Sequence, residues 1–296
     1  MTSPPTSIDR AAELRDTPGI IDRLRADAAT RVLAVREARV LIAAGHLVLR
    51  APDEVADATW ALLGRSADGA PILLASLAPE HGSVDSAPDD TWLGLRGLGG
   101  VLDAFENELL VEALAVDAWV RDAPFCPACG GATELRQAGW SRRCLVCARE
   151  HFPRTDPAVI VAPESADGER LLLGANAIWG GRMYSCFAGF AEAGESLEST
   201  VHRELEEEAG IRLSAVTYVS SQPWPFPRSL MLGFRAVVDD ESAARADGEE
   251  IVDVRWFTRD EIGAALEGEG PVALPGRASI ARRLIELWHR ERSPQH

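Results

Sequence analysis

Four of the five cysteines stand in two closely spaced pairs. Cys126 and Cys129 form the first pair, Cys144 and Cys147 form the second, and 14 residues separate the two. Each pair can form a tight turn, and four converging thiolates complete the closed tetrahedral shell of a structural zinc ion. Two disulfides are the alternative, which a cytosolic setting disfavours. The spacing therefore predicts one structural zinc ion per chain, which performs no chemistry because its shell has no open position.

The segment from Leu197 to Ala209 has the spacing of an amphipathic helix. Its apolar side chains recur every four residues, at Leu197, Val201, Leu205 and Ala209. At about 100° per residue these positions form one stripe that can pack against a core. Gly210 follows, and a residue in the left-handed conformation commonly ends a helix there. The pattern predicts a helix over 197–209.

Carboxylates border this apolar stripe. Glu204 and Glu208 fall beside its edge, and Glu207 lies a little further round. Carboxylates spaced in this way can converge in a cleft and supply the oxygen ligands that Mg²⁺ or Mn²⁺ prefers. Arg203 can hold the Glu207 carboxylate, because residues four apart are neighbours on a helix. Glu206 points the opposite way and is predicted to be solvated. The alternative is an acidic helix that simply lies on the surface.

Strands and helices surround this segment. After Pro157 the sequence predicts six strands, at Ala158–Ala162, Arg170–Gly174, Tyr184–Phe187, Leu213–Ser221, Leu230–Val238 and Ile251–Phe257. Further helices are predicted from the capping box Thr258-x-x-Glu261 onward and over Ala278–Arg290. Cys186, in the third strand, is predicted to be a small core residue.

The first 120 residues have the pattern of an α+β domain. Short strands are predicted within Arg31–Arg50 and at Pro71–Leu77, followed by a helix over Leu98–Val120. The helix is predicted to bury Leu102, Phe105, Leu109, Val116 and Trp119. Its acidic residues Glu106, Glu108 and Glu112 are predicted to form a solvated face, because no supporting motif suggests a metal.

The spacing from Gly189 to Ile211 resembles a known motif. It fits Gly-x5-Glu-x7-Arg-Glu-aliphatic-x-Glu-Glu-x-Gly-aliphatic, the Nudix box, in which Glu195 is the first glutamate and Arg203 the arginine. The chain thus resembles the Nudix hydrolases, which cleave a nucleoside diphosphate linked to another moiety with the help of divalent cations. The resemblance implies an α/β/α sandwich over 157–296.

A second segment narrows the resemblance. Ser221-Gln-Pro-Trp-Pro-Phe-Pro-Arg-Ser229 presents Trp224 and Phe226 between prolines, and an aromatic slot of this kind is preorganised for stacking on a flat ring. Together with the four-Cys ribbon and the Nudix box, it resembles the NADH pyrophosphatase family. The resemblance implies a homodimer that hydrolyses NAD(H) to nicotinamide mononucleotide and AMP, and that also removes NAD caps from the 5′ ends of RNA.

The resemblance also implies roles for individual residues. Mg²⁺ or Mn²⁺ would be bound by Glu204, Glu208, Glu250 and the backbone carbonyl of Ala188. Glu207, Glu208 or Glu250 would accept the proton of the attacking water. Substrate contacts would come from Gln222, Pro223, Trp224, Pro225, Phe226, Pro227, Arg228, Ser229, Phe152, Ala281 and Arg96. Some relatives carry Tyr at the position of Phe152 and an acidic residue at that of Gly139, so this chain lacks the polar groups for the corresponding contacts.

The length and composition of the chain indicate how many domains it has and where it is located. The 296 residues suffice for three parts, which we place at 1–120 (N-terminal α+β), 121–156 (zinc ribbon) and 157–296 (Nudix domain). Apolar residues reach 46% but no apolar run is long enough for a membrane span, and Met1–Arg15 has no leader-like apolar stretch. We therefore expect a cytoplasmic protein without membrane contact.

The net charge of −16 works against broad nucleic-acid binding, although a local arginine cluster can still bind a phosphate group. Two other functions remain open. One is a Nudix hydrolase that prefers ADP-ribose, a dinucleoside polyphosphate or NAD-capped RNA. The other is a non-catalytic protein whose zinc ribbon binds nucleic acid or protein. Turnover that depends on Mg²⁺ separates the catalytic functions from the binding function.

Overall fold

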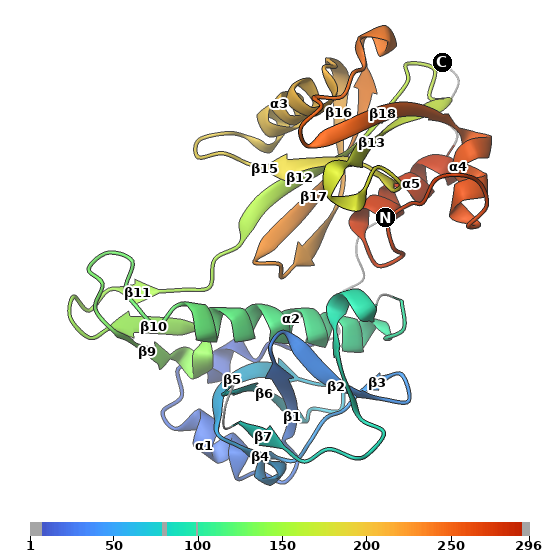
Figure 1. Cartoon of the computed structure of the whole chain (residues 1–296). Helices are drawn as coiled ribbons and strands as arrows, with labels where there is room; N and C mark the ends of the chain where they lie inside the picture. The colour runs from blue at the N-terminus through green and yellow to red at the C-terminus, as the bar shows by residue number, and fades with distance from the viewer. Residues whose placement is uncertain (1–7, 79–81, 99, 292–296) are drawn as a thin grey trace. The chain divides into compact units, whose positions relative to one another are not determined.

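The computed structural model describes residues 8–78, 82–98 and 100–291 (Figure 1). The described residues divide into an N-terminal unit, residues 8–154 with 225–228, and a C-terminal unit, residues 155–224 with 229–291. The predicted zinc-ribbon segment falls almost wholly within the N-terminal unit. The first seven residues of the stretch examined for a leader lie outside the described residues. Among the described residues, no helix is both long and apolar enough to cross a membrane.

The C-terminal unit is built on a mixed sheet. Its strands are β12 (Asp156–Glu164), β13 (Arg170–Asn176), β14 (Tyr184–Ser185), β15 (Phe187–Phe190), β16 (Leu213–Trp224), β17 (Ser229–Val238) and β18 (Ile251–Thr258). They follow the order β14-β13-β12-β17-β16, with β15 paired to β12 and β18 to β13. The strands β12 and β17 at its centre run parallel. Five of the six predicted strand regions are confirmed, whereas Tyr184–Phe187 is divided into β14, which pairs with β13, and β15, which pairs with β12.

Helices cover both faces of this sheet (Figure 1). They are α3 (Leu197–Ala209), α4 (Arg259–Leu266) and α5 (Ile280–Arg290), with short 3₁₀ turns η5 (Ala177–Trp179) and η6 (Glu241–Ala243). Successive side chains of β12 alternate between the faces, as the two-residue period of a strand requires. Val159 and Val161 pack in the core under α3, whereas Ile160 and Ala162 pack in the core with α4 and α5. The predicted α/β/α sandwich is confirmed.

The N-terminal unit contains a second mixed sheet. Its strands are β1 (Arg31–Arg36), β2 (Arg39–Ala43), β3 (His46–Leu47), β5 (Ala58–Arg65), β6 (Pro71–Leu77) and β8 (Thr91–Gly94), and β4 (Val55–Ala56) pairs with β7 (Ser83–Val84) apart from them. The helices are α1 (Ile20–Arg25) and α2 (Ala104–Asp122), with 3₁₀ turns at Ala12–Leu14, Pro52–Glu54 and Leu95–Gly97. The order β3-β2-β1-β6-β5, with α2 packed on β1, β5 and β6, confirms an α+β arrangement.

The long helix α2 begins six residues later than predicted. Asp103 caps it: the Glu106 amide donates to the Asp103 carboxylate at 2.8 Å, and the chain before it folds into a 3₁₀ turn. The prediction of a solvated acidic face is wrong for Glu112, which is only 5% exposed, and Glu106 and Glu108 are half-buried as well. Its carboxylate lies 3.2 Å from Arg10, a residue about one hundred positions earlier. Leu109 and Val116 are buried as predicted, whereas Leu102, Phe105 and Trp119 are half-buried.

Burial of Glu112 predicts a stability that depends on pH. Burial raises the pKa of this carboxyl from 4.5 to about 7, although Arg10 and Arg15 act in the opposite direction. A raised pKa stabilises the fold below the pKa of the unfolded chain, and this contribution is lost as the pH rises through about 7. Relative to wild type, Glu112→Gln should therefore gain about 3 kcal/mol in unfolding free energy between pH 4.5 and 8. Calorimetric unfolding at both pH values measures the gain.

The exposed carboxylate Glu13, in the same unit, provides the control for this measurement. Glu13→Gln, which removes an exposed carboxylate paired with Arg65, should change the unfolding free energy by less than about 1 kcal/mol at either pH. A pH-independent difference for Glu112→Gln would refute the argument.

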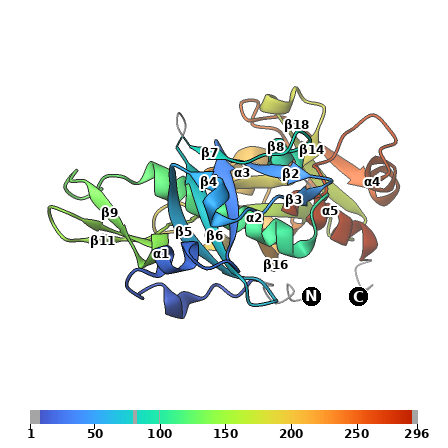
Figure 2. The ribbon, with the colours of Figure 1, turned by 90° about the horizontal axis from the view of Figure 1, so that it is seen from below.

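The zinc-ribbon segment forms a small sheet of its own at the end of α2 (Figure 2). The order is β11-β10-β9, from β9 (Thr133–Arg136), β10 (Ser141–Cys144) and β11 (Glu150–His151), with a 3₁₀ turn at Gln137–Gly139. Trp140 connects this sheet to β5 by a hydrogen bond, in which its indole nitrogen donates to the Leu62 carbonyl at 2.7 Å. The Arg15 guanidinium lies 3.8 Å from the centre of the Trp140 ring, within the range of a cation–π contact.

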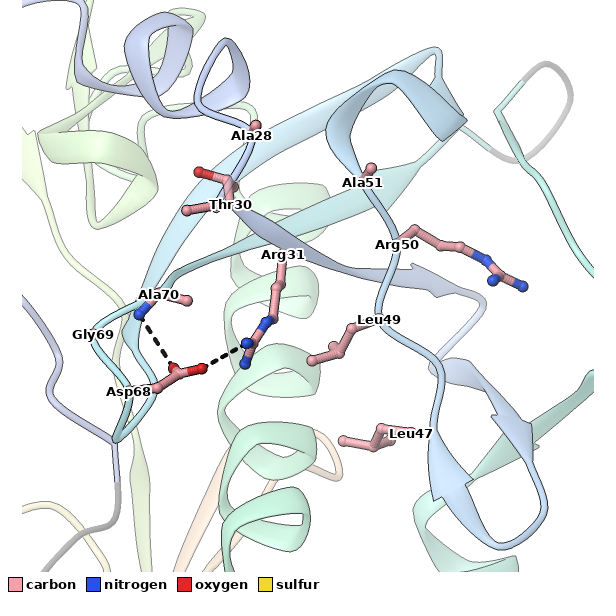
Figure 3. A pocket seen from close by; sticks show the side chains of 11 residues that line it. Ala28, Thr30, Arg31, Leu47, Leu49, Arg50, Ala51, Asp68, Gly69 and Ala70 are labelled. Carbon is pink, nitrogen blue, oxygen red and sulfur yellow. Dashed lines mark hydrogen bonds and ion pairs between the residues drawn. The ribbon is translucent and has the colours of Figure 1, made fainter.

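A depression of about 780 Å³ lies in the N-terminal unit between β1, the segment after β3, and the turn between β5 and β6. Figure 3 shows Leu47 and Leu49 pointing into it, and Arg31 turned towards Asp68. Arg31 pairs with Asp68 at 2.6 Å, and Arg50 points away from the depression and pairs with Asp90. Both arginines that line it are thus already neutralised.

Candidate active site and zinc site

The four predicted zinc ligands come together. Their sulfur atoms all lie within 4.8 Å of one another, with Cys126 and Cys147 separated by 3.7 Å and Cys129 and Cys144 by 3.5 Å. Zinc–sulfur bonds of about 2.3 Å in a tetrahedron place the sulfurs about 3.8 Å apart. The residues therefore fit zinc. The carboxylate oxygens of the C-terminal unit make no comparably tight group among the residues the structure describes.

Backbone amides favour the thiolate form that a metal requires. The amides of Val146 and Cys147 both donate to the Cys144 sulfur at 3.4 Å. The Cys147 amide, followed by that of Val146, lowers the pKa of Cys144 to about 6. The His151 ring nitrogen lies 3.2 Å from the Cys126 sulfur, a contact that the sequence pattern did not suggest.

We expect Cys144→Ser to lose most of the bound zinc and to lower the unfolding temperature of the N-terminal unit. A structural zinc site contributes folding energy directly, and the other three thiolates cannot close the shell. Zinc content by mass spectrometry and calorimetric unfolding check this. Cys186→Ala is the matched control: Cys186 is buried as predicted, its thiol lies 3.8 Å from the Ala281 carbonyl, and its loss should leave the zinc content unchanged.

The helix α3 positions the carboxylates, and both of its ends are set by local sequence. Its bounds agree with the prediction, Ser196 accepts a hydrogen bond from the Ser199 amide at its start, and Gly210 at its end has a left-handed φ of 66°. The predicted stripe is confirmed: Val201, Leu205 and Ala209 are fully buried. Glu206 is exposed, as predicted.

Arg203 organises the carboxylates around it. Its Nη1 donates to Glu204 at 2.8 Å and to Glu207 at 3.0 Å, which confirms the predicted contact with Glu207. Its Nε and Nη2 donate to the two oxygens of Glu195 at 2.8 and 2.9 Å. These bonds raise the pKa of Arg203 and lower that of Glu195 to about 2. The box thus fixes its arginine at the centre of three carboxylates.

Glycine is required at position 189 because Glu204 approaches it closely. A Cβ atom at Gly189 would lie 2.0 Å from both Cδ and Oε1 of Glu204, far inside van der Waals contact. The missing side chain lets the buried Glu204 carboxylate lie directly on β15. Burial raises the pKa of Glu204, and Arg203 opposes this shift.

Glu208 is buried without full compensation. It is 6% exposed, and its Oε2 has no hydrogen-bond partner among residues 8–78, 82–98 and 100–291. Burial, followed by the charges of Glu250 and Glu204, raises the pKa of Glu208 to about 8, while the backbone of Ala188 lowers it. A buried carboxylate surrounded by like charges is costly unless a cation compensates it. The donor set consists of hard oxygens, so it fits Mg²⁺ or Mn²⁺.

Glu250 enters this group from the loop before β18. Its Oε1 accepts a hydrogen bond from the Asn176 side chain at 3.1 Å, and its carbonyl accepts one from the Ala177 amide at 2.9 Å. Asp247 shapes the loop: its Oδ1 accepts the amides of residues 249, 250 and 251 at 2.7 to 3.0 Å. The sequence analysis did not select Asp247 or Asn176, although Asp247-Gly248 is a turn signal.

The predicted substrate residues occur in both units. Gln222, Pro223 and Trp224 end β16, Ser229 begins β17, and Ala281 lies in α5, all in the C-terminal unit. Phe152 and Arg96 belong to the N-terminal unit, as does the turn from Pro225 through Phe226 and Pro227 to Arg228. The structure supports two local contacts within this set.

Within the N-terminal unit, the Arg96 guanidinium lies 5.3 Å from the centre of the Phe226 ring. Within the C-terminal unit, the Gln222 side chain joins β16 to the start of α5. It donates to the Ala278 carbonyl at 2.7 Å and accepts from the Ile280 amide at 2.8 Å. Sequence reasoning did not select Phe190, which is 53% exposed next to Gly189 and whose carbonyl accepts from Arg203 at 2.9 Å.

Two family models match the chain. The NUDIX domain covers residues 154–275, and the NADH pyrophosphatase zinc ribbon domain covers residues 121–152. The second match, together with the geometry of the four thiols, confirms the prediction of a structural zinc site.

The similarity to curated proteins extends over most of the chain. NAD-capped RNA hydrolase NudC of Mycobacterium bovis BCG is 40% identical over 305 aligned residues, which cover 93% of this chain and 96% of that protein. Its counterpart in Mycobacterium tuberculosis is 39% identical with the same coverage. NAD-capped RNA hydrolase NUDT12 of Homo sapiens is 38% identical over 62% of this chain and 42% of its own length.

Proposed function

Because this chain belongs to the NudC-type Nudix hydrolases that carry an NADH pyrophosphatase zinc ribbon, we propose that it cleaves the diphosphate bond of NAD(H). The products are nicotinamide mononucleotide and AMP, and the same reaction removes NAD caps from RNA. One observation carries the proposal within the site: Glu208 is buried near the charges of Glu204 and Glu250, and no described residue forms a hydrogen bond with its Oε2. A divalent metal bound at this site would compensate the charge of this buried carboxylate.

The catalytic metal would be held by Glu204, Glu208, Glu250 and the Ala188 carbonyl. When bound, Mg²⁺ or Mn²⁺ neutralises charge on the diphosphate oxygens and lowers the pKa of a bound water. Glu207, Glu208 or Glu250 accepts the proton of the attacking water. Glu207 suits this role, because its side chain is 60% exposed and yet held by Arg203.

The remaining residues orient and bind. Arg203 holds Glu204 and Glu207 at fixed positions. Ordering these carboxylates therefore costs little further entropy when the substrate binds. The rings of Phe190, Trp224 and Phe226 offer flat surfaces for the nicotinamide or adenine base. Phe152, 38% exposed, can also stack, although it lacks a hydroxyl.

The proposal is tested by chromatography of NADH, NAD and ADP-ribose after separate incubation with the purified protein and Mn²⁺ or Mg²⁺. We expect metal-dependent AMP and reduced nicotinamide mononucleotide from NADH. Cleavage of ADP-ribose alone would keep the Nudix chemistry and overturn the substrate. Failure to cleave any of the three substrates would favour a binding protein.

We also propose that the enzyme is a cytoplasmic homodimer. The family relation supports the dimer, and five cysteines without an expected disulfide suit a reducing compartment. Light scattering coupled to size-exclusion chromatography measures the mass of the assembly directly, and a monomer would contradict this part of the proposal.

A further inference from the structure

A depression of about 610 Å³ lies on the C-terminal unit, between the end of α4, the start of α5 and the connection from β13 to β14. Backbone hydrogen bonds join two of its walls. The Tyr184 amide donates to the Ala273 carbonyl at 2.9 Å, and the Ala273 amide donates to the Arg182 carbonyl at 3.2 Å. Pro271 and Pro275 limit the freedom of the loop that forms another wall. The lining is therefore held in place by the main chain.

Three arginines, Arg182, Arg277 and Arg282, line this depression. Arg282 is buried, and its donors are partly used: Nε donates to Glu286 and Nη2 to the Leu266 carbonyl, both at 2.9 Å. Arg182 and Arg277 are exposed, and within the described part of the chain their side chains form no hydrogen bond or ion pair. These two guanidinium groups are thus available to a ligand.

The charge of the depression is opposite to that of the protein. Among the residues that line it, Glu267 is the one carboxylate, so the two available arginines outnumber it. The chain as a whole carries a net charge of −16. Guanidinium groups bind phosphate through paired, charge-assisted hydrogen bonds. The depression in the N-terminal unit differs, because Asp68 and Asp90 pair with both of its arginines.

Arg277 of this depression lies close in sequence to residues that we place at the proposed substrate site. Arg277 directly precedes Ala278, whose carbonyl accepts the hydrogen bond from Gln222, and Ala281 follows three residues later. Free NAD(H) has one diphosphate, and the proposed metal site would bind it. Capped RNA has further phosphodiester groups beyond it. Building on the proposed function, we propose that Arg182 and Arg277 bind a phosphodiester of the RNA chain attached to the cap.

The test compares two double variants of equal charge. R182A/R277A removes the proposed contacts, and R212A/R283A removes two exposed arginines of the same unit outside the depression. Binding of a short fluorescent NAD-capped RNA is measured by anisotropy without added divalent metal, and NADH cleavage is measured with Mn²⁺. R182A/R277A should raise the Kd for RNA about tenfold and should make its dependence on salt shallower by about 0.7 in log–log slope, as expected for the loss of one phosphate contact. NADH cleavage should stay within about twofold of wild type in both variants.

Each result either supports or overturns the assignment of Arg182 and Arg277. An unchanged Kd in R182A/R277A, or an equal loss in R212A/R283A, overturns the assignment. If the Kd for RNA is unchanged and inorganic phosphate inhibits NADH cleavage in wild type but not in R182A/R277A, the depression binds free phosphate instead. A wild-type protein that cleaves neither NADH nor capped RNA would refute the proposed function, while the anisotropy would still decide the phosphate site.

Discussion

Glu208→Gln is expected to lower kcat for NADH by at least about 1,000-fold while the protein stays folded. The substitution keeps the shape of the side chain and removes one charge from the oxygen set that would hold the metal. Because Glu208 is buried next to Glu204 and Glu250, loss of this charge relieves repulsion. The unfolding temperature without added metal should therefore be equal to or higher than that of wild type. Turnover and calorimetric unfolding are measured on the same preparation.

Glu206→Gln is the matched control for this experiment. Glu206 lies on the same helix, is exposed, and pairs only distantly with Arg212, at 3.8 Å. Its substitution makes the same change in charge and should leave kcat within about twofold. Full metal-dependent turnover by Glu208→Gln would contradict the assignment of Glu208.

Arg203→Lys is expected to lower kcat/KM for NADH about 100-fold and to raise the Mn²⁺ concentration needed for half-maximal rate. Lysine keeps the positive charge but offers one ammonium in place of a planar fork. Its three N–H donors cannot replace the five hydrogen bonds that Arg203 donates to three carboxylates and the Phe190 carbonyl. The buried Glu204 would then lose its fixed position. A metal titration of the rate separates this effect from a general loss of folded protein.

Arg212→Lys serves as the control, because Arg212 is 81% exposed and lies outside α3. A metal requirement in Arg203→Lys equal to that of wild type would show that the arrangement of the guanidinium is not needed. Arg203 would then contribute its charge alone.

The C-terminal unit was largely predictable because its signals are local. The bounds of α3 follow from Ser196, the four-residue apolar spacing and Gly210, which are all adjacent in sequence. Thr258 and Glu261 form the capping box that the sequence indicates for α4. The zinc ligands were equally accessible, because paired cysteines need only the two turns that hold them. The metal, substrate and base roles of the other residues stay predictions.

What could not be predicted depends on partners distant in sequence. Helical spacing placed Glu112 on a solvated face, because no residue near it in sequence indicates that the arginines at positions 10 and 15 lie close to it in the fold. Asp247 was missed for a related reason: its turn is ordinary, and its importance comes from where Glu250 lies in the folded chain. Phe190 lies inside the recognised motif, but only the structure reveals that its ring is exposed. The spacing of polar residues shows which residues share one face of a helix. It does not show which distant segment packs against that face.

The contact between Gln222 and the start of α5 has a consequence for how this sequence can diverge. Gln222 bonds to main-chain atoms at positions 278 and 280, across 56 and 58 residues, and to neither of their side chains. The side chain at position 278 can therefore change without loss of this contact, whereas Ile280 is also buried in the core, and insertions or deletions between positions 222 and 278 would have to preserve the match. Position 222 itself has little freedom, because glutamate could not donate to the carbonyl and leucine could do neither. We thus expect position 278 to vary in side-chain type, while positions 222 and 280 and the length of the chain near them vary little.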